Sequence, residues 1–434
     1  MDITRKDPKN RFKLISIAVL AVLLNSFSVY AQQLIKNHVT EKTISINSIE
    51  PDSIDFSDLK PIGDAIGNSD VVMLGEQDHG DAPAFLAKTR LIKYLHEKKG
   101  FNVLAFESDF FGLNYGWQKI GKTHPVIDTF ILKNIFSVWT ICNTCNNLFY
   151  HYIPFTYSTN TPLVLTGFDS QQYLNFSYYN LSKCLDSNFR AKNLPITKQA
   201  NYNTEILSLI DSPKRWIFFP PKDTVKVHLC LESLKTIRNQ LNSEVTVDSF
   251  WVLVIDNLIQ QTNDVLAKFK TGKYTLNGRD IQMSINLKWL IEKKFKDQKI
   301  IVWAASSHIA KFSNNIDNRD LKNTETMGDH LVKTLTKSKK VYILGFTSLQ
   351  GIAGRIGMRP YDVHPLKKNS FESWINPLYR YAFLDFSDFN KKYPYSNEDF
   401  YMCGFGHVSL MAKWNNIYDG MFYIRDMYRC IPTR

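Results

Sequence analysis

Four side chains that could activate water come at or just after the ends of short apolar runs in this sequence of 434 residues. They are Glu76, His79, Glu107 and His308. A histidine whose pKa lies near working pH can take a proton from water, and a buried carboxylate beside it fixes its tautomer and raises its basicity. The four residues therefore predict a hydrolytic site in which they are the catalytic groups.

The same four side chains leave a second chemistry open. Two imidazoles and two carboxylates are an adequate ligand set for a divalent metal such as Zn²⁺ or Mn²⁺, and a metal-dependent hydrolase of ester or amide bonds would use Glu76, His79, Glu107 and His308 as ligands. The first expectation is an enzyme with no metal or other cofactor. The sequence has no Gly-x-Ser-x-Gly nucleophile elbow, no Gly-x-Gly-x-x-Gly dinucleotide loop and no His-Glu-x-x-His zinc helix.

The elements that must position these groups form a strand, helix and strand in succession. The apolar run Val71–Leu74 predicts a buried strand, the spacing from Pro83 to Lys99 predicts a helix, and Val103–Phe106 predicts a second strand. In such a unit the two strands are parallel and their carboxyl ends share one edge of the sheet, where open α/β sheets place their sites. Five more runs predict strands: Pro162–Leu165, Lys299–Ala304, Val341–Gly345, Tyr381–Phe386 and Gly420–Ile424.

These elements predict an α/β fold with a mainly parallel sheet flanked by helices. The pattern changes after Tyr173, where segments such as Val227–Leu241 and Phe250–Phe269 carry apolar residues at helical spacing. We expect four regions: a signal peptide at 1–31, the first part of an α/β catalytic domain at 32–172, a mostly helical insertion or cap at 173–290, and the second part of the catalytic domain at 291–434.

The amino terminus has the pattern of a secretory signal. Basic residues up to Lys13 precede the apolar run Leu14–Leu24, which is short for a membrane span, and small residues favour cleavage after Ala31. We expect a periplasmic or secreted protein without a stable membrane span after cleavage; a retained anchor is the alternative. The formal charge of +12 is scattered among acidic residues, so nucleic acid is not an expected partner.

Cysteine usage permits disulfides in an exported protein. The sequence has six cysteines, and Cys142-Asn-Thr-Cys145 has the spacing of a redox or metal motif without a second such pair. A local disulfide between these two residues, or two plain thiols, is the simpler expectation. The spacing does not assign the other pairings.

Several ordered motifs resemble the erythromycin esterase family. They are Gly75-Glu76-x-x-His79-Gly80, Gly100-Phe101-x-x-x-Ala105-x-Glu107, Gly167-Phe168-Asp169, Arg279-Asp280-x-x-Met283, Val302-Trp303-Ala304 with His308, Met327-Gly328-x-His330-Leu331 and Gly345-Phe346-Thr347. The resemblance implies metal-independent or metal-assisted hydrolysis of a carboxylic ester. The missing nucleophile elbow predicts that no covalent serine intermediate forms. Macrolide lactones are the best-known substrates of the family, so the implied partner is a small-molecule ester and a role in antibiotic resistance is one expectation.

The resemblance also implies roles for individual residues. His79 matches the general base, Glu76 and Glu107 match the essential acids, and His308 matches the second histidine of a family segment. The residues expected to bind substrate are Lys88, Arg90, Asp169, Arg279 and Ser307.

Two positions depart from the family pattern. Ala305 replaces the first histidine of the His308 segment, so another donor would have to polarise the carbonyl; Ser306, Ser307, Lys88 and His330 are the alternatives. The pair Gln77-Asp78 replaces two smaller residues before His79. Because Ala305 replaces this histidine, a binding protein with weakened catalysis is a further alternative.

Overall fold

The structure is a computed structural model that describes most of the chain after residue 31. The described residues are 32–243, 249–272, 276–318, 321, 324–396 and 398–433. The predicted signal peptide at residues 1–31 lies outside them. Within the described ranges, no helix is both long enough and apolar enough to cross a membrane.

The strands include all those predicted from the apolar runs, and four short strands that the sequence did not indicate. They are β1 (Ile44–Ile46), β2 (Val71–Glu76), β3 (Phe101–Asp109), β4 (Val164–Asp169), β5 (Lys299–Ala305), β6 (Val341–Ala353), β7 (Tyr361–Asp362), β8 (Tyr381–Asp385), β9 (Phe400–Met402), β10 (Leu410–Ala412) and β11 (Gly420–Met427). The unexpected strands β1, β7, β9 and β10 have two or three residues each, too few to show a pattern.

A helix at residues 32–42 precedes the first strand, and further helices connect or cover the strands. They are α2 (Lys60–Ile66), α3 (Ala82–Lys99), α4 (Trp117–Lys119), α5 (His124–Asn134), α6 (Ser137–Thr140), α7 (Ile153–Thr156), α8 (Asn175–Ala191), α9 (Leu207–Asp211), α10 (Pro213–Trp216), α11 (Val225–Asn242), α12 (Ser249–Thr271), α13 (Leu276–Trp289), α14 (Ser306–Ile309), α15 (Met327–Thr334), α16 (Phe371–Trp374), α17 (Ser387–Lys392) and α18 (Trp414–Ile417).

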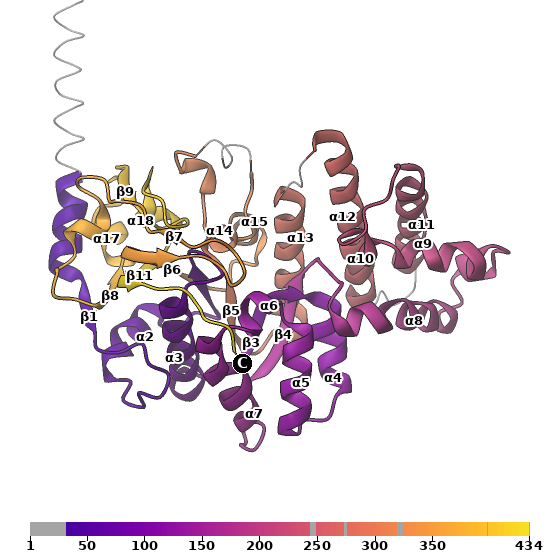
Figure 1. Cartoon of the computed structure of the whole chain (residues 1–434), viewed down its shortest axis with the longest axis horizontal. Coiled ribbons are helices and arrows are strands. Elements are labelled where there is room, and N and C mark those ends of the chain that lie inside the picture. Colours follow the sequence, from indigo (N-terminus) through magenta and orange to yellow (C-terminus); the bar gives the residue numbers. More distant parts are fainter. Residues whose placement is uncertain are drawn as a thin grey trace, which may run out of the picture.

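One sheet organises the molecule. In the described chain it has nine strands, with the main order β1-β8-β11-β6-β2-β5-β3-β4 and with β7 attached to β6. Every pair from β11 to β4 is parallel, whereas β8 is antiparallel to β11 and to β1. Figure 1 shows α2, α3, α5 and α7 on one face and α13, α14 and α15 on the other. The predicted mainly parallel α/β fold is confirmed.

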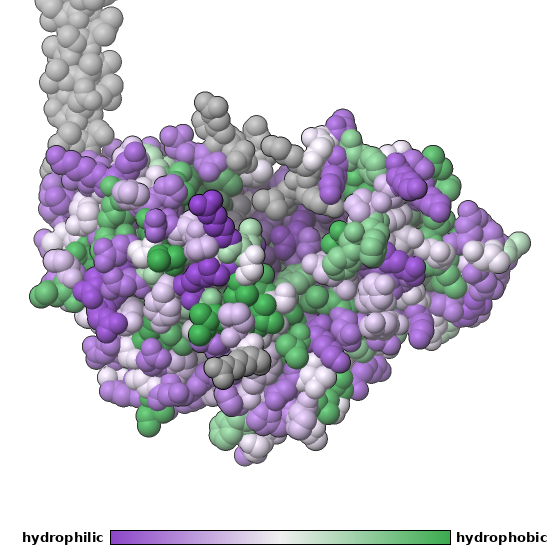
Figure 2. Space-filling view, viewed as in Figure 1, coloured by the Kyte–Doolittle hydropathy of each residue, from purple (hydrophilic) through white to green (hydrophobic). Residues whose placement is uncertain are grey.

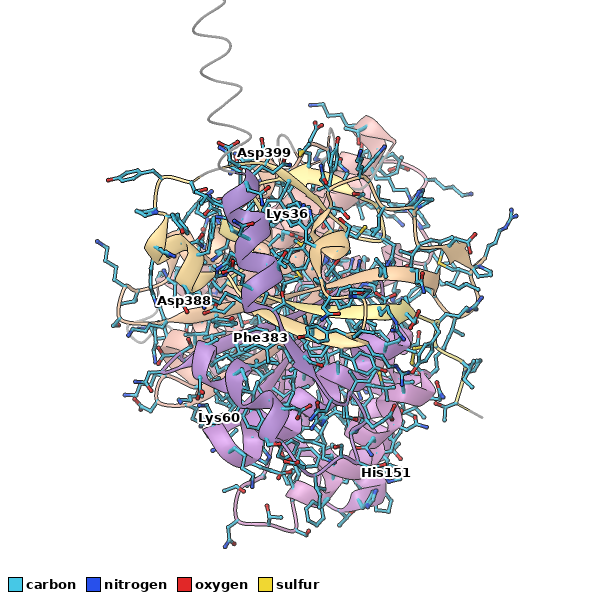
Figure 3. All side chains as sticks on the ribbon, turned by 90° about the vertical axis from the view of Figure 1, so that its left-hand side faces the viewer. Lys36, Lys60, His151, Phe383, Asp388 and Asp399 are labelled. Atoms are coloured by element: carbon cyan, nitrogen blue, oxygen red, sulfur yellow. A yellow bond between two sulfur atoms is a disulfide. The ribbon has the colours of Figure 1, made fainter. Side chains whose placement is uncertain are left out.

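Both faces of the central strands are buried, which explains their continuous apolar sequence. Leu74 and Trp303 point into the core on the side of α3, while Met73 and Val302 point into the core on the opposite side. Figure 3 shows the same layers from the edge of the sheet, with Phe383 of β8 between the helix that carries Lys36 and the helix that carries Lys60.

The predicted unit of strand, helix and strand is confirmed as β2, α3 and β3. Helix α3 ends at Gly100, which has a φ of 74° and caps the helix in the left-handed conformation that glycine accommodates. Strand β5 lies between β2 and β3. The carboxyl ends of all three strands therefore meet, and a register shift between Phe106 and Asp109 interrupts β3 beside Glu107.

The region expected to be helical, residues 173–290, contains α8 to α13. These helices have a core of their own, to which Leu185, Leu234 and Val254 contribute, and it also receives Phe110 and Phe111 from the end of β3. Figure 1 shows α8 to α12 beside the sheet, with α13 between them and α14. Helix α13 thus carries Arg279 and Asp280 towards the ends of the strands.

The expected local pairing of Cys142 with Cys145 is wrong. Cys142 forms a disulfide with Cys430, 288 residues further along the chain, and Cys145 is a buried free thiol. The bond joins the segment that follows α6 to the segment that follows β11. Spacing cannot reveal such a pair, because only the fold brings the two segments together.

Candidate active site

His79 stands on the loop between β2 and α3, and Glu76 at the end of β2 holds its ring. Nδ1 of His79 lies 3.0 Å from Oε1 of Glu76. Because an ionised carboxylate only accepts hydrogen bonds, Nδ1 carries the proton and Nε2 keeps its lone pair. The carboxylate is fully buried, whereas the imidazole is 14% exposed. This arrangement leaves a basic nitrogen on a side chain that water can reach.

The carboxylate of Glu76 is itself fixed by two donors. Nε1 of Trp139 donates to Oε1 over 3.1 Å, and the ammonium of Lys88 donates to Oε2. Lys88 is fully buried, with its nitrogen 3.3 Å from the carbonyl oxygen of Ala304 and 4.4 Å from the centre of the Trp303 ring. Burial lowers the pKa of Lys88, and the charge of Glu76 opposes that shift. Lys88 thus neutralises Glu76 from behind.

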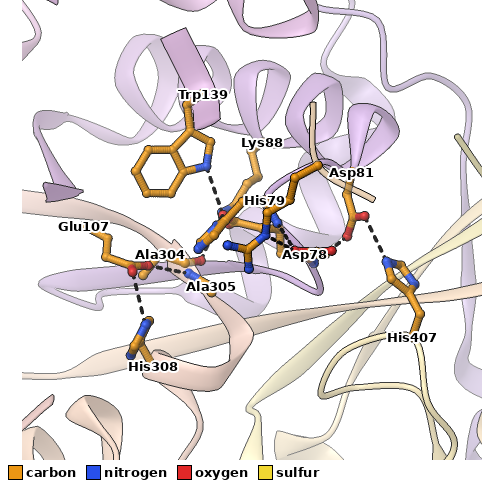
Figure 4. Close-up of polar contacts among 12 residues, drawn as sticks. Asp78, His79, Asp81, Lys88, Glu107, Trp139, Ala304, Ala305, His308 and His407 are labelled. Atoms are coloured by element: carbon orange, nitrogen blue, oxygen red, sulfur yellow. Dashed lines mark hydrogen bonds and ion pairs between the residues drawn. The ribbon is translucent and has the colours of Figure 1, made fainter. Parts of the chain in front are cut away.

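A second cluster forms around Glu107. Its Oε1 accepts from Nε2 of His308 at 3.1 Å and from Nη2 of Arg279 at 3.0 Å, and its Oε2 accepts from the backbone N–H of Ala305 at 3.0 Å. The other imidazole nitrogen of His308, Nδ1, lies 2.8 Å from Oδ1 of Asp280. Figure 4 shows Glu107 bonded to both His308 and Ala305.

His308 is a fixed cation in this cluster. Both of its nitrogens face carboxylates, so both must carry protons. Burial favours the neutral ring, but the charges of Asp280 and Glu107 outweigh burial and raise the pKa of His308 to about 10. Burial would raise the pKa of Glu107, yet the neighbouring His308, His79 and Arg279 hold it well below its ordinary value. Of the two histidines, only His79 keeps a ring nitrogen that no carboxylate of the described residues contacts.

Arg279 on α13 connects this cluster to β4. Its Nε and Nη2 donate to the two carboxylate oxygens of Asp169 at 3.1 Å and 2.6 Å. Asp169 is fully buried at the end of β4, and this bidentate pair fixes the plane of the guanidinium. The two clusters therefore combine the carboxyl ends of β2, β3, β4 and β5, which meet at one edge of the sheet, with side chains of α3, α6, α13 and α14.

A cavity of about 460 Å³ opens over both clusters. His79, Glu107, Arg279, Ser307 and His308 line it together with side chains of α6 and of the loop after β4. Figure 2 shows the molecule hollowed, with hydrophilic side chains, between the sheet and the helices α10 to α12 of Figure 1. A cavity of this size suits a small molecule.

The residues expected to bind substrate fall into three groups. Arg279 and Ser307 line the cavity, whereas Lys88 and Asp169 are buried behind it. Arg90 is not brought to the cavity: its guanidinium binds Asp58 through Nη2 at 2.7 Å and Nη1 at 2.9 Å. Residues two apart on an α-helix point about 200° apart, so Lys88 and Arg90 face opposite sides of α3.

The donors considered in place of a histidine at Ala305 do not all lie at the cavity. Ser307 lines the cavity, while Ser306 is fully buried. Nδ1 of His330 lies 3.4 Å from Glu325, away from the residues that line the cavity. Ala305 itself lines the cavity, where its backbone N–H already serves Glu107.

The ligand set considered for a metal does not converge on one point. No group of three or more His, Cys, Asp or Glu side chains in the described ranges is arranged to hold a metal ion. Both nitrogens of His308 donate to carboxylates, so that ring offers no lone pair, and Lys88 already holds an oxygen of Glu76. The residues present therefore do not fit a metal centre built on Glu76, His79, Glu107 and His308.

Sequence reasoning assigned no polar contact to three groups that shape this site. Trp139 lies in an aromatic-rich segment that the sequence predicts to form core or pocket wall, and its indole N–H binds Glu76. Asp280 follows Arg279 in a recognised motif, so its position was a signal that could have been used. His407 had none: its Nε2 lies 2.9 Å from Oδ1 of Asp81, whose Oδ2 accepts the backbone N–H of Asp78 in the His79 loop (Figure 4).

Known proteins resemble this chain in sequence and in fold. The protein "Putative hydrolase YbfO" of Bacillus subtilis (strain 168) is 23% identical over 355 residues, which cover 77% of this chain and 78% of that protein. A solved structure of the erythromycin esterase EreC, a variant in its open conformation, has 15% identity and a TM-score of 0.66, covering 90% of this chain and 98% of that one.

A solved structure of a Bacillus cereus protein has 18% identity and a TM-score of 0.65 and covers 93% of this chain and 99% of that one. These structural likenesses, at under 25% identity, concern the fold. The family model for erythromycin esterase matches residues 96–426, well over half of the sequence. On that match, this chain belongs to the erythromycin esterase family of hydrolases.

Proposed function

We propose that the protein hydrolyses a carboxylic ester or lactone with a water molecule activated by His79. The observation that carries the proposal is the 3.0 Å contact between Nδ1 of His79 and the buried carboxylate of Glu76, at the wall of the cavity. Because that contact holds the proton on Nδ1, Nε2 can accept a proton from water.

The reaction follows from this proton position. Nε2 of His79 takes a proton from water while the water oxygen attacks the carbonyl carbon, which becomes tetrahedral. When the intermediate collapses, the same nitrogen returns the proton to the departing alkoxide, and the products are an acid and an alcohol. Glu76 stabilises the transient imidazolium, and Lys88 and Trp139 keep Glu76 in place.

The Glu107 cluster supports the same step. The carboxylate of Glu107 lies close enough to His79 for the two charges to interact. It therefore stabilises His79 after the ring has accepted a proton. Arg279 and His308 hold Glu107 ionised, and their many bonds make this wall of the cavity rigid.

The proposed substrate is a small-molecule ester, with macrolide lactones as one class, because the EreC structure that shares the fold is that of an erythromycin esterase. The proposed reaction uses no metal, because His79 can activate water directly. We also propose export: the disulfide between Cys142 and Cys430 suits an oxidising compartment, as does the amino-terminal sequence.

The experiment is an assay of the purified protein on simple esters, aliphatic lactones and macrolides, with and without EDTA. We expect turnover that survives EDTA. His79→Ala should lower kcat by roughly 10²–10⁴-fold, the usual contribution of a general base. Its melting temperature should change little, because the side chain is partly exposed on a loop.

His124→Ala is the matched control, since His124 is an exposed histidine on α5 outside the cavity. It should keep wild-type kcat. Activity lost to EDTA and restored by Zn²⁺ or Mn²⁺ would replace the metal-free scheme with the metal-dependent one. Binding of lactones without turnover of any ester would identify a binding protein.

A further inference from the structure

Hydrolysis by His79 creates a negative charge on the carbonyl oxygen, and that charge needs a donor in the cavity. Among the described residues, three cationic side chains line the cavity: Arg279, His308 and Arg355. Arg279 is engaged by Asp169 and Glu107, and both nitrogens of His308 are engaged by Asp280 and Glu107. These two cations therefore have their carboxylate partners already.

Arg355 differs from the other two in how it is held. Its side chain is 43% exposed and pairs with one carboxylate, that of Asp78. Among the hydrogen bonds of the described residues, Arg355 donates through Nε alone, to Oδ1 of Asp78 at 2.7 Å. The two terminal nitrogens, which present a planar fork of N–H groups, remain for a ligand in the cavity.

The same carboxylate ties Arg355 to the catalytic loop. Oδ1 of Asp78 also accepts the backbone N–H of His79 at 2.8 Å, so the guanidinium and the general base are attached to one oxygen atom. Oδ2 of Asp78 accepts the hydroxyl of Tyr361 at 2.7 Å. Burial opposes ionisation of Asp78, but Arg355 and Tyr361 lower its pKa. Asp78 thus fixes Arg355 relative to His79.

Backbone packing holds the two loops together at the same place. A Cβ at Gly80 would lie 2.3 Å from the carbonyl oxygen of Gly354, so glycine is required for this approach. Gly354 has a φ of 125°, a conformation that favours glycine and that lets β6 turn towards β7 directly before Arg355. The position of Arg355 is therefore built into the backbone and does not depend on the Asp78 pair alone.

We propose that Arg355 is the catalytic residue that stabilises the oxyanion, by donating from its terminal nitrogens to the carbonyl oxygen that His79-activated water attacks. This inference rests on the proposed function. It names a group on the β6–β7 connection, remote in sequence from the His79 loop. It also gives a purpose to Asp78, which positions Arg355 and the His79 loop together.

The experiment compares Arg355→Ala, Arg355→Lys and Arg359→Ala on a neutral p-nitrophenyl ester and on the same ester with a carboxylate in its acyl part. Arg355→Ala should lower kcat by about 10²–10³-fold on both esters, the range for loss of an oxyanion donor. Added guanidinium ion should restore part of that loss. The kcat of Arg355→Lys should lie between those of wild type and Arg355→Ala, because an ammonium keeps the charge without the planar fork of N–H groups. Arg359→Ala, an exposed arginine on the same connection, should match wild type.

Binding of an alkyl phosphonate monoester, whose charged tetrahedral group imitates the oxyanion, gives a readout besides turnover. Arg355→Ala should bind it at least ~100-fold more weakly than wild type, in step with kcat. If Arg355→Ala folds and raises only KM for the acidic ester, Arg355 is an anchor for anionic substrates and the inference is wrong. If Arg355→Ala does not fold, a wild-type kcat in Arg355→Lys would overturn it.

A failure of the proposed function itself would give different experimental results. In that case wild type would turn over no ester, or His79→Ala would be as active as wild type, and the inference would fall with the proposal. Loss of turnover in His79→Ala beside unchanged kcat and phosphonate affinity in Arg355→Ala would leave the proposed function standing and reject Arg355 alone.

Discussion

Replacing Asp280 by Asn tests whether His308 is a permanent cation. The change keeps the size of the side chain and removes the charge that lies 2.8 Å from Nδ1 of His308. In the wild type, Asp280 and Glu107 raise the pKa of His308 to about 10, against a value of about 6.5 in the unfolded chain. We expect the pKa of His308 to fall in Asp280→Asn. Burial lowers this pKa, and in the variant only the carboxylate of Glu107 still raises it.

The difference in pKa sets the magnitude. A group with a raised folded pKa stabilises the protein fully below about pH 6.5, and this stabilisation is lost as the pH rises towards 10. The loss is about 1.4 kcal/mol per pH unit and at most ~5 kcal/mol in total. Breaking a buried pair by removing one partner costs about 3–5 kcal/mol, which agrees. The gap in stability between wild type and Asp280→Asn should therefore be largest near pH 6.5 and should shrink by pH 9.5.

The assay is denaturant unfolding of both proteins between pH 6 and pH 9.5, together with NMR titration of the His308 ring. Asp297→Asn is the matched control, since Asp297 is an exposed acid beside Lys296 and should leave the pH dependence unchanged. A gap that stays constant with pH, or a wild-type His308 that titrates between pH 6 and pH 7, would refute the reasoning.

Two further outcomes follow from the structure. Cys430→Ser should lower the free energy of unfolding by about 2–5 kcal/mol, and reduction of the wild type should do the same. It should also lower kcat, because the backbone N–H of Cys430 binds the carbonyl oxygen of Gly80 beside His79, and wild-type kcat in the variant would contradict this. Arg90→Ala should cost about 3–5 kcal/mol by leaving Asp58 unpaired, with KM unchanged; a raised KM in a stable variant would return Arg90 to substrate binding.

The sequence alone determined the fold class and which polar side chains meet in the candidate site. Continuous apolar runs such as Val71–Leu74 are typical of strands buried on both faces, and the polar residues that end them must lie at one edge of a parallel sheet. Glu76, His79 and Glu107 were therefore found from local pattern. The contact between Nδ1 of His79 and Glu76, three residues apart, also depends mainly on local chain geometry.

Only the tertiary structure decided what each of these groups touches. In the sequence His308 is one of two candidate catalytic histidines, and the approach of Asp280 from α13 and Glu107 from β3 makes it a cation. Cys142 forms its disulfide with Cys430 and not with its neighbour Cys145. Asp78 accepts a hydrogen bond from Arg355, 277 residues away. Pairs like these depend on strand order and loop packing, because hydrogen bonds and charges act over a few ångströms of space, however many residues separate the partners.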